Sequence, residues 1–268
     1  MLTVQADLNI FTLYSFLNTV GYDDENNKSG MHPQRIQIRN NLFKIAEDLD
    51  TSDFKSYFQT YYLENKVHLF HFNTYALSLS KDTDFKLVNT NYSTSLLPNL
   101  NSILKDFYSK FGIKALWERM AESHNIISAK YNEVSENIVN IAQSYFSEKP
   151  DSKITITVVP NLLESYFRNK SILIENDLYL LFGPYKNNGA NTEGISHEYL
   201  HLLVNPIIDK YNKEINAFCI FISFKKIHSF TSCLALAAIK STLACLFSFI
   251  AFELNLRIST NHCSLFSK

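Results

Sequence analysis

The stretch GISHEYLHLLVNP, residues 194–206, contains two histidines four positions apart, with a glutamate directly after the first. On a helix this spacing places His197 and His201 on one face, one turn apart. The other side of the same helix would carry an apolar stripe made of Ile195, Tyr199, Leu202, Leu203 and Pro206. We therefore expect a helix that packs through this stripe and presents both imidazoles to a cleft.

The residues at both ends of this stretch suggest where the helix begins and ends. Asn191 or Thr192 can cap its N-terminus, and Glu193 would lie in the first turn, where a carboxylate is favourable. Pro206 disfavours helical geometry at Asn205. We expect the helix to end there, just after His201.

The sequence on the N-terminal side of the motif changes character near residue 150. Residues 153–160, KITITVVP, alternate as a strand does, and residues 171–184 are typical of a hairpin. Helical spacing prevails earlier, in residues 8–20 before Gly21, 35–49, 52–65 and 97–146. Residues 1–20, which lack the segments of a signal peptide, are expected to form one amphipathic helix. The prediction is an α+β fold with a helical region, 1–150, and a second region, 151–268, that contains a short sheet, the motif helix and a helical tail.

Two histidines at i and i+4 are a common way to supply two zinc ligands. Glu198 is offset around the helix from both histidines. It could reach a water on the metal without ligating the metal, and take the proton of that water as a general base. The other histidines in the chain, including His68 and His71, lack this pattern and are left out of the predicted site.

The motif HEYLH, residues 197–201, resembles the HExxH signature of the zincin metallopeptidases. Val204 stands where metzincins have glycine, so the gluzincin pattern is the one that remains. More narrowly, residues 21–39 and 197–211 resemble a group of bacterial zincin-like proteins with an H-E-x-x-H-x-x-V-N-P helix. The resemblance implies a zincin-like fold and peptidase chemistry on a peptide or protein substrate. It also implies that His197 and His201 are Zn²⁺ ligands and that Glu198 is the catalytic base.

The third protein ligand is expected to be Glu253. A catalytic zinc takes three protein ligands, and gluzincins supply the third as a glutamate from a later helix. Glu253 is the only carboxylate after Glu214. One alternative is that Glu253 forms an ordinary surface pair with Arg257. The competing ligands are Asp209 and Glu214, which could fold back to the metal after Pro206, and, less favoured, His228 and His262.

The C-terminal residues differ in composition from the rest of the chain. All four cysteines and only one acidic residue occur in residues 218–268. We read the cysteines as buried apolar residues. Residues 232–252 are long and apolar enough for a membrane span, but Lys240 near the middle favours a buried helix. A third alternative is that this tail is not the C-terminus typical of the family.

The composition of the chain narrows the possible functions. A net charge of −1 gives no basic excess to neutralise phosphates, which argues against a nucleic-acid partner. The leading hypothesis is a zinc-dependent peptidase. The alternatives are a catalytically inactive zincin-fold binding or scaffold protein, and a protein attached to a membrane through its tail.

Overall fold

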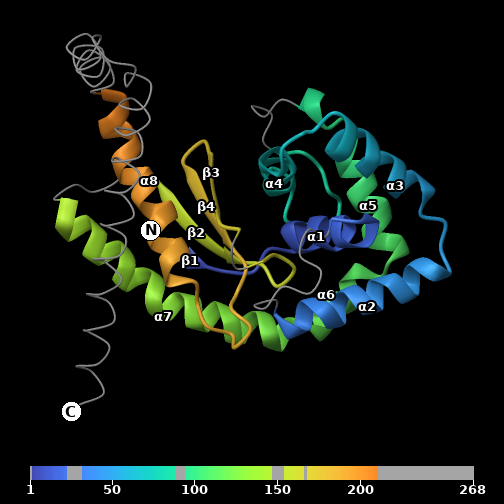
Figure 1. Ribbon diagram of the computed structural model, residues 1–268, viewed down its shortest axis with the longest axis horizontal. Coiled ribbons are helices and arrows are strands. Elements are labelled where there is room, and N and C mark those ends of the chain that lie inside the picture. The colour runs from blue at the N-terminus through green and yellow to red at the C-terminus, as the bar shows by residue number, and fades with distance from the viewer. Residues whose placement is uncertain (1, 23–31, 89–93, 147–153, 166–167, 211–268) are drawn as a thin grey trace, which may run out of the picture. The chain divides into compact units, whose positions relative to one another are not determined.

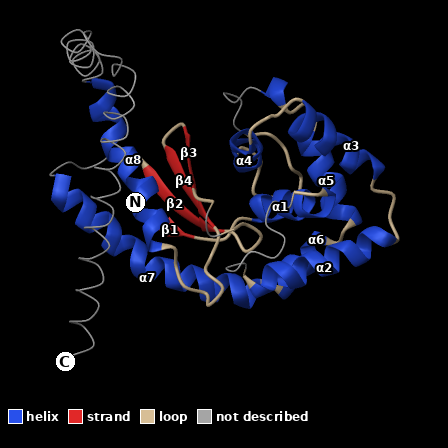
Figure 2. Cartoon of the chain, in the orientation of Figure 1, coloured by secondary structure: helices blue, strands red, loops and turns tan. Residues whose placement is uncertain are grey.

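The computed structural model describes residues 2–22, 32–88, 94–146, 154–165 and 168–210 (Figure 1). Within these ranges the chain has the predicted α+β composition, with eight α-helices and one four-stranded sheet (Figure 2). The predicted region boundary at residue 150 lies outside the described residues. So do the whole C-terminal tail, its cysteines and Glu253.

The chain divides into two compact units. Unit 1 comprises Met1–Val134 and Lys153–Asn191, and unit 2 comprises Ser135–Ser152 and Thr192–Lys268. Unit 1 therefore contains the whole sheet and helices α1 to α6. Unit 2 contains the helix with the HEYLH motif, and α7 (Ala121–Phe146) contributes residues to both units.

The sheet of unit 1 has the strand order β1-β2-β4-β3. Its strands are β1 (Leu2–Val4), β2 (Thr155–Pro160), β3 (Lys170–Ile174) and β4 (Asp177–Phe182). β2 is parallel to both β1 and β4, whereas β3 and β4 form the predicted antiparallel hairpin. Glu175 in its turn adopts a left-handed conformation with a φ of 55°, as tight hairpin turns require.

The prediction of one helix over residues 1–20 is wrong at its beginning. Leu2–Val4 form strand β1, in register with Ile156–Val158. The helix α1 (Leu8–Val20) begins only after Asp7, whose carboxylate accepts a hydrogen bond from the Ile10 amide at 2.9 Å. A three-residue edge strand has no pattern of its own, because its pairing depends on a partner far away in the sequence.

Helix α1 is the centre of the helical part of unit 1. It lies against α2 (Pro33–Glu47), α3 (Ser52–Phe58), α4 (Leu69–Leu77), α5 (Leu100–Lys110) and α6 (Ile113–Arg119). All its residues from 9 to 19 are buried. The polar ones are tolerated because several bond within the helix, as when Thr12 donates to the Leu8 carbonyl at 2.8 Å. The predicted stop at Gly21 is confirmed by its φ of 113°.

Two of the predicted helical stretches are divided in the structure. Residues 97–146 form α5, α6 and α7, with a first break at Gly112, whose φ is 60°. Residues 52–65 form α3 followed by a π-helical segment, η1 (Gln59–Glu64). Among the described helices, none combines the length and the hydropathy that a membrane-spanning segment requires.

Candidate metal and catalytic site

Helix α8 (Thr192–Lys210) carries the HEYLH motif, as predicted. Ile195, Tyr199 and Leu203 of the predicted stripe are buried, whereas Leu202 is partly exposed. Leu200 and Ser196 are also buried, and the Ser196 hydroxyl donates to the Thr192 carbonyl at 2.9 Å. The apolar side of α8 is therefore wider than the sequence pattern indicated.

The imidazoles of His197 and His201 lie next to each other on α8. Their Nε2 atoms are 3.1 Å apart, and their rings are nearly perpendicular, at 88°. His197 is exposed and His201 is partly buried. Two nitrogens bound to one tetrahedral zinc at about 2.0–2.1 Å would be about 3.3 Å apart. The same nitrogen of each ring thus lies at nearly the separation that a shared metal ion requires.

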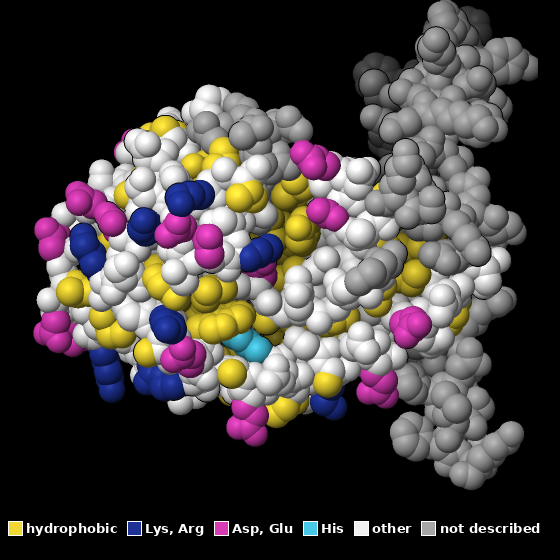
Figure 3. Space-filling view, turned by 180° about the vertical axis from the view of Figure 1, so that it is seen from behind, with side chains coloured by type: hydrophobic (Ala, Val, Ile, Leu, Met, Phe, Trp, Pro, Cys, Tyr) yellow, Lys and Arg dark blue, Asp and Glu magenta, His cyan; other side chains and the backbone are white. Residues whose placement is uncertain are grey.

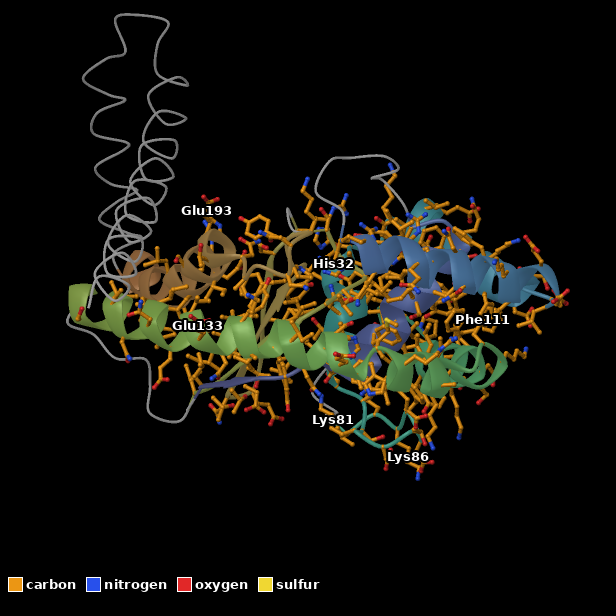
Figure 4. The ribbon with its side chains drawn as sticks, turned by 90° about the horizontal axis from the view of Figure 1, so that it is seen from below. His32, Lys81, Lys86, Phe111, Glu133 and Glu193 are labelled. Carbon is orange, nitrogen blue, oxygen red and sulfur yellow. The ribbon has the colours of Figure 1, made fainter. Side chains whose placement is uncertain are left out.

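Glu198 lies between the two histidines in the sequence but on a more enclosed part of the helix. The residue as a whole is only 9 % exposed, and within the described part of the chain its side chain makes no hydrogen bond or ion pair. Glu193, in the first turn of the same helix, is exposed and points away from the ribbon (Figure 4). The two glutamates on α8 therefore have very different surroundings.

The prediction that Pro206 ends the helix is wrong, because α8 continues to Lys210. A proline inside a helix loses the bond from its own nitrogen to the carbonyl four residues earlier, but the following residues can stay helical. Asp209 is consequently eight residues after His201 on the same helix, about 12 Å further along its axis. The backbone at Asp209 therefore does not turn back towards His201, as that alternative required.

A catalytic zinc on the two histidines would need a further ligand from elsewhere in the chain. Within the described residues, no group of three or more His, Cys, Asp or Glu side chains is arranged to hold a metal ion. Glu253 and Glu214, the other acids considered from the sequence, lie outside the described residues. Their assignment stays a prediction.

Three histidines outside the motif either cap a helix or pack against an aromatic ring. The Nδ1 atoms of His32 and His68 accept hydrogen bonds from the amides of Gln34 and Phe70, each at 3.2 Å, and thereby cap α2 and α4. His124 is buried against Trp117, with ring centroids 4.2 Å apart. Burial lowers the pKa of His124 to about 4.

A buried polar network in unit 1 was missed from the sequence. Glu164, 3 % exposed, accepts hydrogen bonds from the Lys170 ammonium at 2.8 Å and from the Ser165 amide at 2.9 Å. Its two carboxylate oxygens each lie 3.4 Å from the Tyr22 hydroxyl. The sequence signal was a glutamate directly after two leucines in NLLES, residues 161–165, six positions before a lysine.

In comparisons with known proteins, no protein-family model, no curated protein and no solved structure matches the chain. The resemblance to zincins therefore depends on the residues of the chain itself. For the site, the relevant observations are the paired Nε2 atoms of His197 and His201 and the low exposure of the residue Glu198 between them in the sequence.

Proposed function

We propose that this protein is a zinc-dependent hydrolase of peptide bonds, with its site on α8. His197 and His201 would hold the metal through Nε2, and Glu198 would act as the general base. The observation that carries the proposal is the 3.1 Å separation of the two Nε2 atoms. It fits zinc because imidazole nitrogen is a preferred zinc ligand and two of them are already paired.

Zinc in such a site lowers the pKa of a bound water and polarises the carbonyl of the substrate. The protein supplies the proton transfers. As the water oxygen bonds to the carbonyl carbon, Glu198 would take the proton that the water loses. It would then give that proton to the amide nitrogen as the carbon–nitrogen bond breaks, so that the amine leaves in neutral form.

The surroundings of Glu198 support this role. Glu198 is 9 % exposed as a whole residue, and its carboxylate makes no hydrogen bond or ion pair with a described residue. A structural role as an ion-pair or capping residue is therefore not visible there. A side chain kept largely from solvent without such a partner is available to a reacting water.

The decisive experiment compares Glu198→Gln with Glu193→Gln on the same helix. Zinc content is measured by elemental analysis, and turnover is measured on a library of peptides. We expect Glu198→Gln to keep its zinc and to lose roughly 10²- to 10⁴-fold in activity, because an amide cannot accept the proton of the water. Glu193→Gln should retain both zinc and turnover, since its side chain is exposed.

Two further variants test the metal ligands. His197→Ala and His201→Ala should each lose most of the approximately one zinc ion per chain that the wild type is expected to bind. His71→Ala, on α4 of unit 1, is the control. Equal zinc in all these proteins would reject the metal site. A wild type that holds zinc but hydrolyses no peptide would reject the peptidase proposal and favour a zinc-binding protein without catalysis.

A further inference from the structure

Unit 1 contains a cavity of about 580 Å³ at the start of α4. Residues 66–69 and 168–170 line it, together with Tyr62 of η1. We call this feature the donor-lined cavity. It belongs to unit 1, whereas the histidine pair of α8 belongs to unit 2.

Three hydrogen-bond donors of this lining have no acceptor in the part of the chain that the structure describes. Lys66 is exposed, and its ammonium makes no hydrogen bond or ion pair there. The Oδ1 atom of Asn169 accepts from the side-chain amide of Asn191 at 2.9 Å, which leaves the NH₂ group of Asn169 to donate. His68 accepts from the main-chain amide of Phe70 at Nδ1, so its neutral ring has the proton on Nε2. The lining therefore offers donors that a ligand with acceptor oxygens would satisfy.

The same lining has cations but no acidic residue. Lys66, Arg168 and Lys170 belong to it, although the chain has a net charge of −1 and charges of both signs are mixed over the face shown in Figure 3. Lys170 is balanced by the carboxylate of Glu164, at 2.8 Å. Arg168 donates to the Tyr22 hydroxyl at 2.8 Å and takes part in a further interaction, so it is not counted as a free cation. One positive charge, that of Lys66, is left for a ligand.

The main chain fixes the position of Lys66 beside the cavity. The residue follows η1 and its cap in a left-handed conformation, with a φ of 52°. On either side of it, the Asn65 amide donates to the Thr60 carbonyl and the Val67 amide to the Tyr61 carbonyl, both at 2.9 Å. Asparagine adopts this conformation more readily than lysine does. An asparagine at this position would therefore remove the charge without straining the turn.

The remaining lining is aromatic and aliphatic. Tyr62 stacks on Phe58 at 4.8 Å between ring centroids and contacts the ring of Tyr22 edge-on at 5.8 Å. Val67 and the buried Leu69 extend this surface. A cavity of about 150 Å³ can hold a benzene molecule, so a cavity of 580 Å³ has room for a body of two rings.

We infer that the donor-lined cavity binds a monocarboxylate carried on a two-ring aromatic body. The carboxylate would accept from the Lys66 ammonium and the Asn169 amide, with His68 as a further donor. The rings would lie against Tyr62 and Leu69. One negative charge matches the one cation left unbalanced, and the two carboxylate oxygens together offer about four acceptor sites, enough for all three donors.

The first test uses 2-naphthoate as the probe, with binding to the full chain measured by titration calorimetry. We expect saturable binding that Lys66→Asn weakens about three- to fivefold, because the variant removes the one unbalanced charge. The control Lys44→Gln removes an exposed lysine of α2 outside the lining and should change the dissociation constant by less than about twofold.

The second test removes the amide donor while keeping its neighbouring bond. Asn169→Asp retains an oxygen for the side chain of Asn191 but places a second carboxylate beside the ligand. It should weaken binding about tenfold or more. Asn101→Asp on α5 is the matched control, because the Oδ1 atom of Asn101 likewise accepts a hydrogen bond, from the Tyr75 hydroxyl at 3.2 Å. That control should bind 2-naphthoate within about twofold of the wild type.

Three related probes test the charge and the size of the ligand. The neutral 2-naphthamide should bind about threefold or more weakly than 2-naphthoate, and benzoate about tenfold or more weakly because it lacks the second ring. The doubly charged 2-naphthyl phosphate should gain little over 2-naphthoate, since only one cation is unbalanced. An amide or a benzoate that binds as tightly as 2-naphthoate would overturn the inference, and so would a phosphate that binds tenfold more tightly.

The zinc site of α8 is excluded with His197→Ala, because a carboxylate could also bind a metal. This variant should bind 2-naphthoate as the wild type does, whether or not the metal proposal holds. Loss of binding in His197→Ala would overturn the assignment to unit 1. Absence of saturable binding, or Lys66→Asn and Asn169→Asp variants that bind like their controls, would also overturn it.

Discussion

Gly183 lies in direct contact with the backbone that carries Glu164. A methyl group on Gly183 would be 2.4 Å from the Glu164 carbonyl oxygen and 2.4 Å from the Ser165 carbonyl carbon. Both neighbours are main-chain atoms and cannot rotate away. The end of β4 therefore determines how closely the segment with the buried carboxylate can approach the sheet.

Gly183→Ala should destabilise the protein by about 1–3 kcal/mol, because overpacking against the backbone forces one of the two segments to move. Urea unfolding followed by the fluorescence of Trp117, the single tryptophan, measures the change. Gly112→Ala is the control: its added methyl would meet nothing within 4 Å, and only the φ of 60° is unfavourable. That control should cost about 1 kcal/mol. A Gly183→Ala variant as stable as wild type would contradict the close approach.

The buried pair of Lys170 and Glu164 should be strongly coupled. Their side chains are 14 % and 3 % exposed, so Lys170→Met would leave a carboxylate without its cation in a largely dry site. The expected loss in the free energy of unfolding is about 3–5 kcal/mol. Adding Glu164→Gln to Lys170→Met should recover part of this loss. The exposed pair of Lys86 and Asp84 is the control, and Lys86→Met should leave the free energy of unfolding nearly unchanged. Additive effects of the two buried substitutions would disprove the coupling.

His124 should make the protein sensitive to acid. Its pKa falls from 6.5 to about 4 because burial disfavours the charged ring. The folded state thus binds fewer protons than the unfolded state, and stability present above pH 6.5 is lost as the pH falls towards 4. The loss attributable to this residue should be roughly 2 kcal/mol between pH 7 and 4.5.

The variant His124→Phe isolates this contribution, since an aromatic ring can still pack on Trp117 and Phe11. Urea unfolding at pH 7 and pH 4.5 should show a smaller difference for the variant than for the wild type. Identical pH dependence in the two proteins would assign the acid sensitivity to other groups.

Glu253 remains the predicted third zinc ligand. Glu253→Gln should reduce zinc affinity far more than Asp209→Asn, because Asp209 lies about 12 Å along α8 from His201. Competition with a chelator measures each dissociation constant, and circular dichroism checks that the variants are folded. If Glu214→Gln releases zinc and Glu253→Gln does not, Glu214 is the ligand and the assignment is wrong.

The sequence predicted those elements whose signals are local. Helix α1 has an apolar pattern and ends at Gly21, and the β3–β4 hairpin has two apolar runs around a short polar turn. Helix α8 begins at Thr192, as its capping residues suggested. In each case the decisive residues lie within a few positions of one another.

The missed features depend on distant residues or on context. The buried network of unit 1 joins Tyr22 to Glu164, which are 142 positions apart in the chain. Pro206 disfavours helical geometry only at Asn205 and removes one hydrogen bond, so the sequence did not show that α8 would continue through it to Lys210. In the candidate site, the histidine pair could be predicted because both ligands share one helix. A third ligand could not be predicted in the same way, because the position of a residue on another segment depends on how the whole chain folds.

Strand β1 has a consequence for how the protein forms. The hydroxyls of Thr3 and Thr157, 3.2 Å apart across β1 and β2, are separated by 154 residues. On a ribosome that adds about 5–20 residues per second, β1 would wait roughly 8–30 s for its partner strand. Helices α1 to α6 can assemble on one another in that interval, while the backbone groups of Leu2–Val4 stay unpaired and open to chaperones or to other nascent chains.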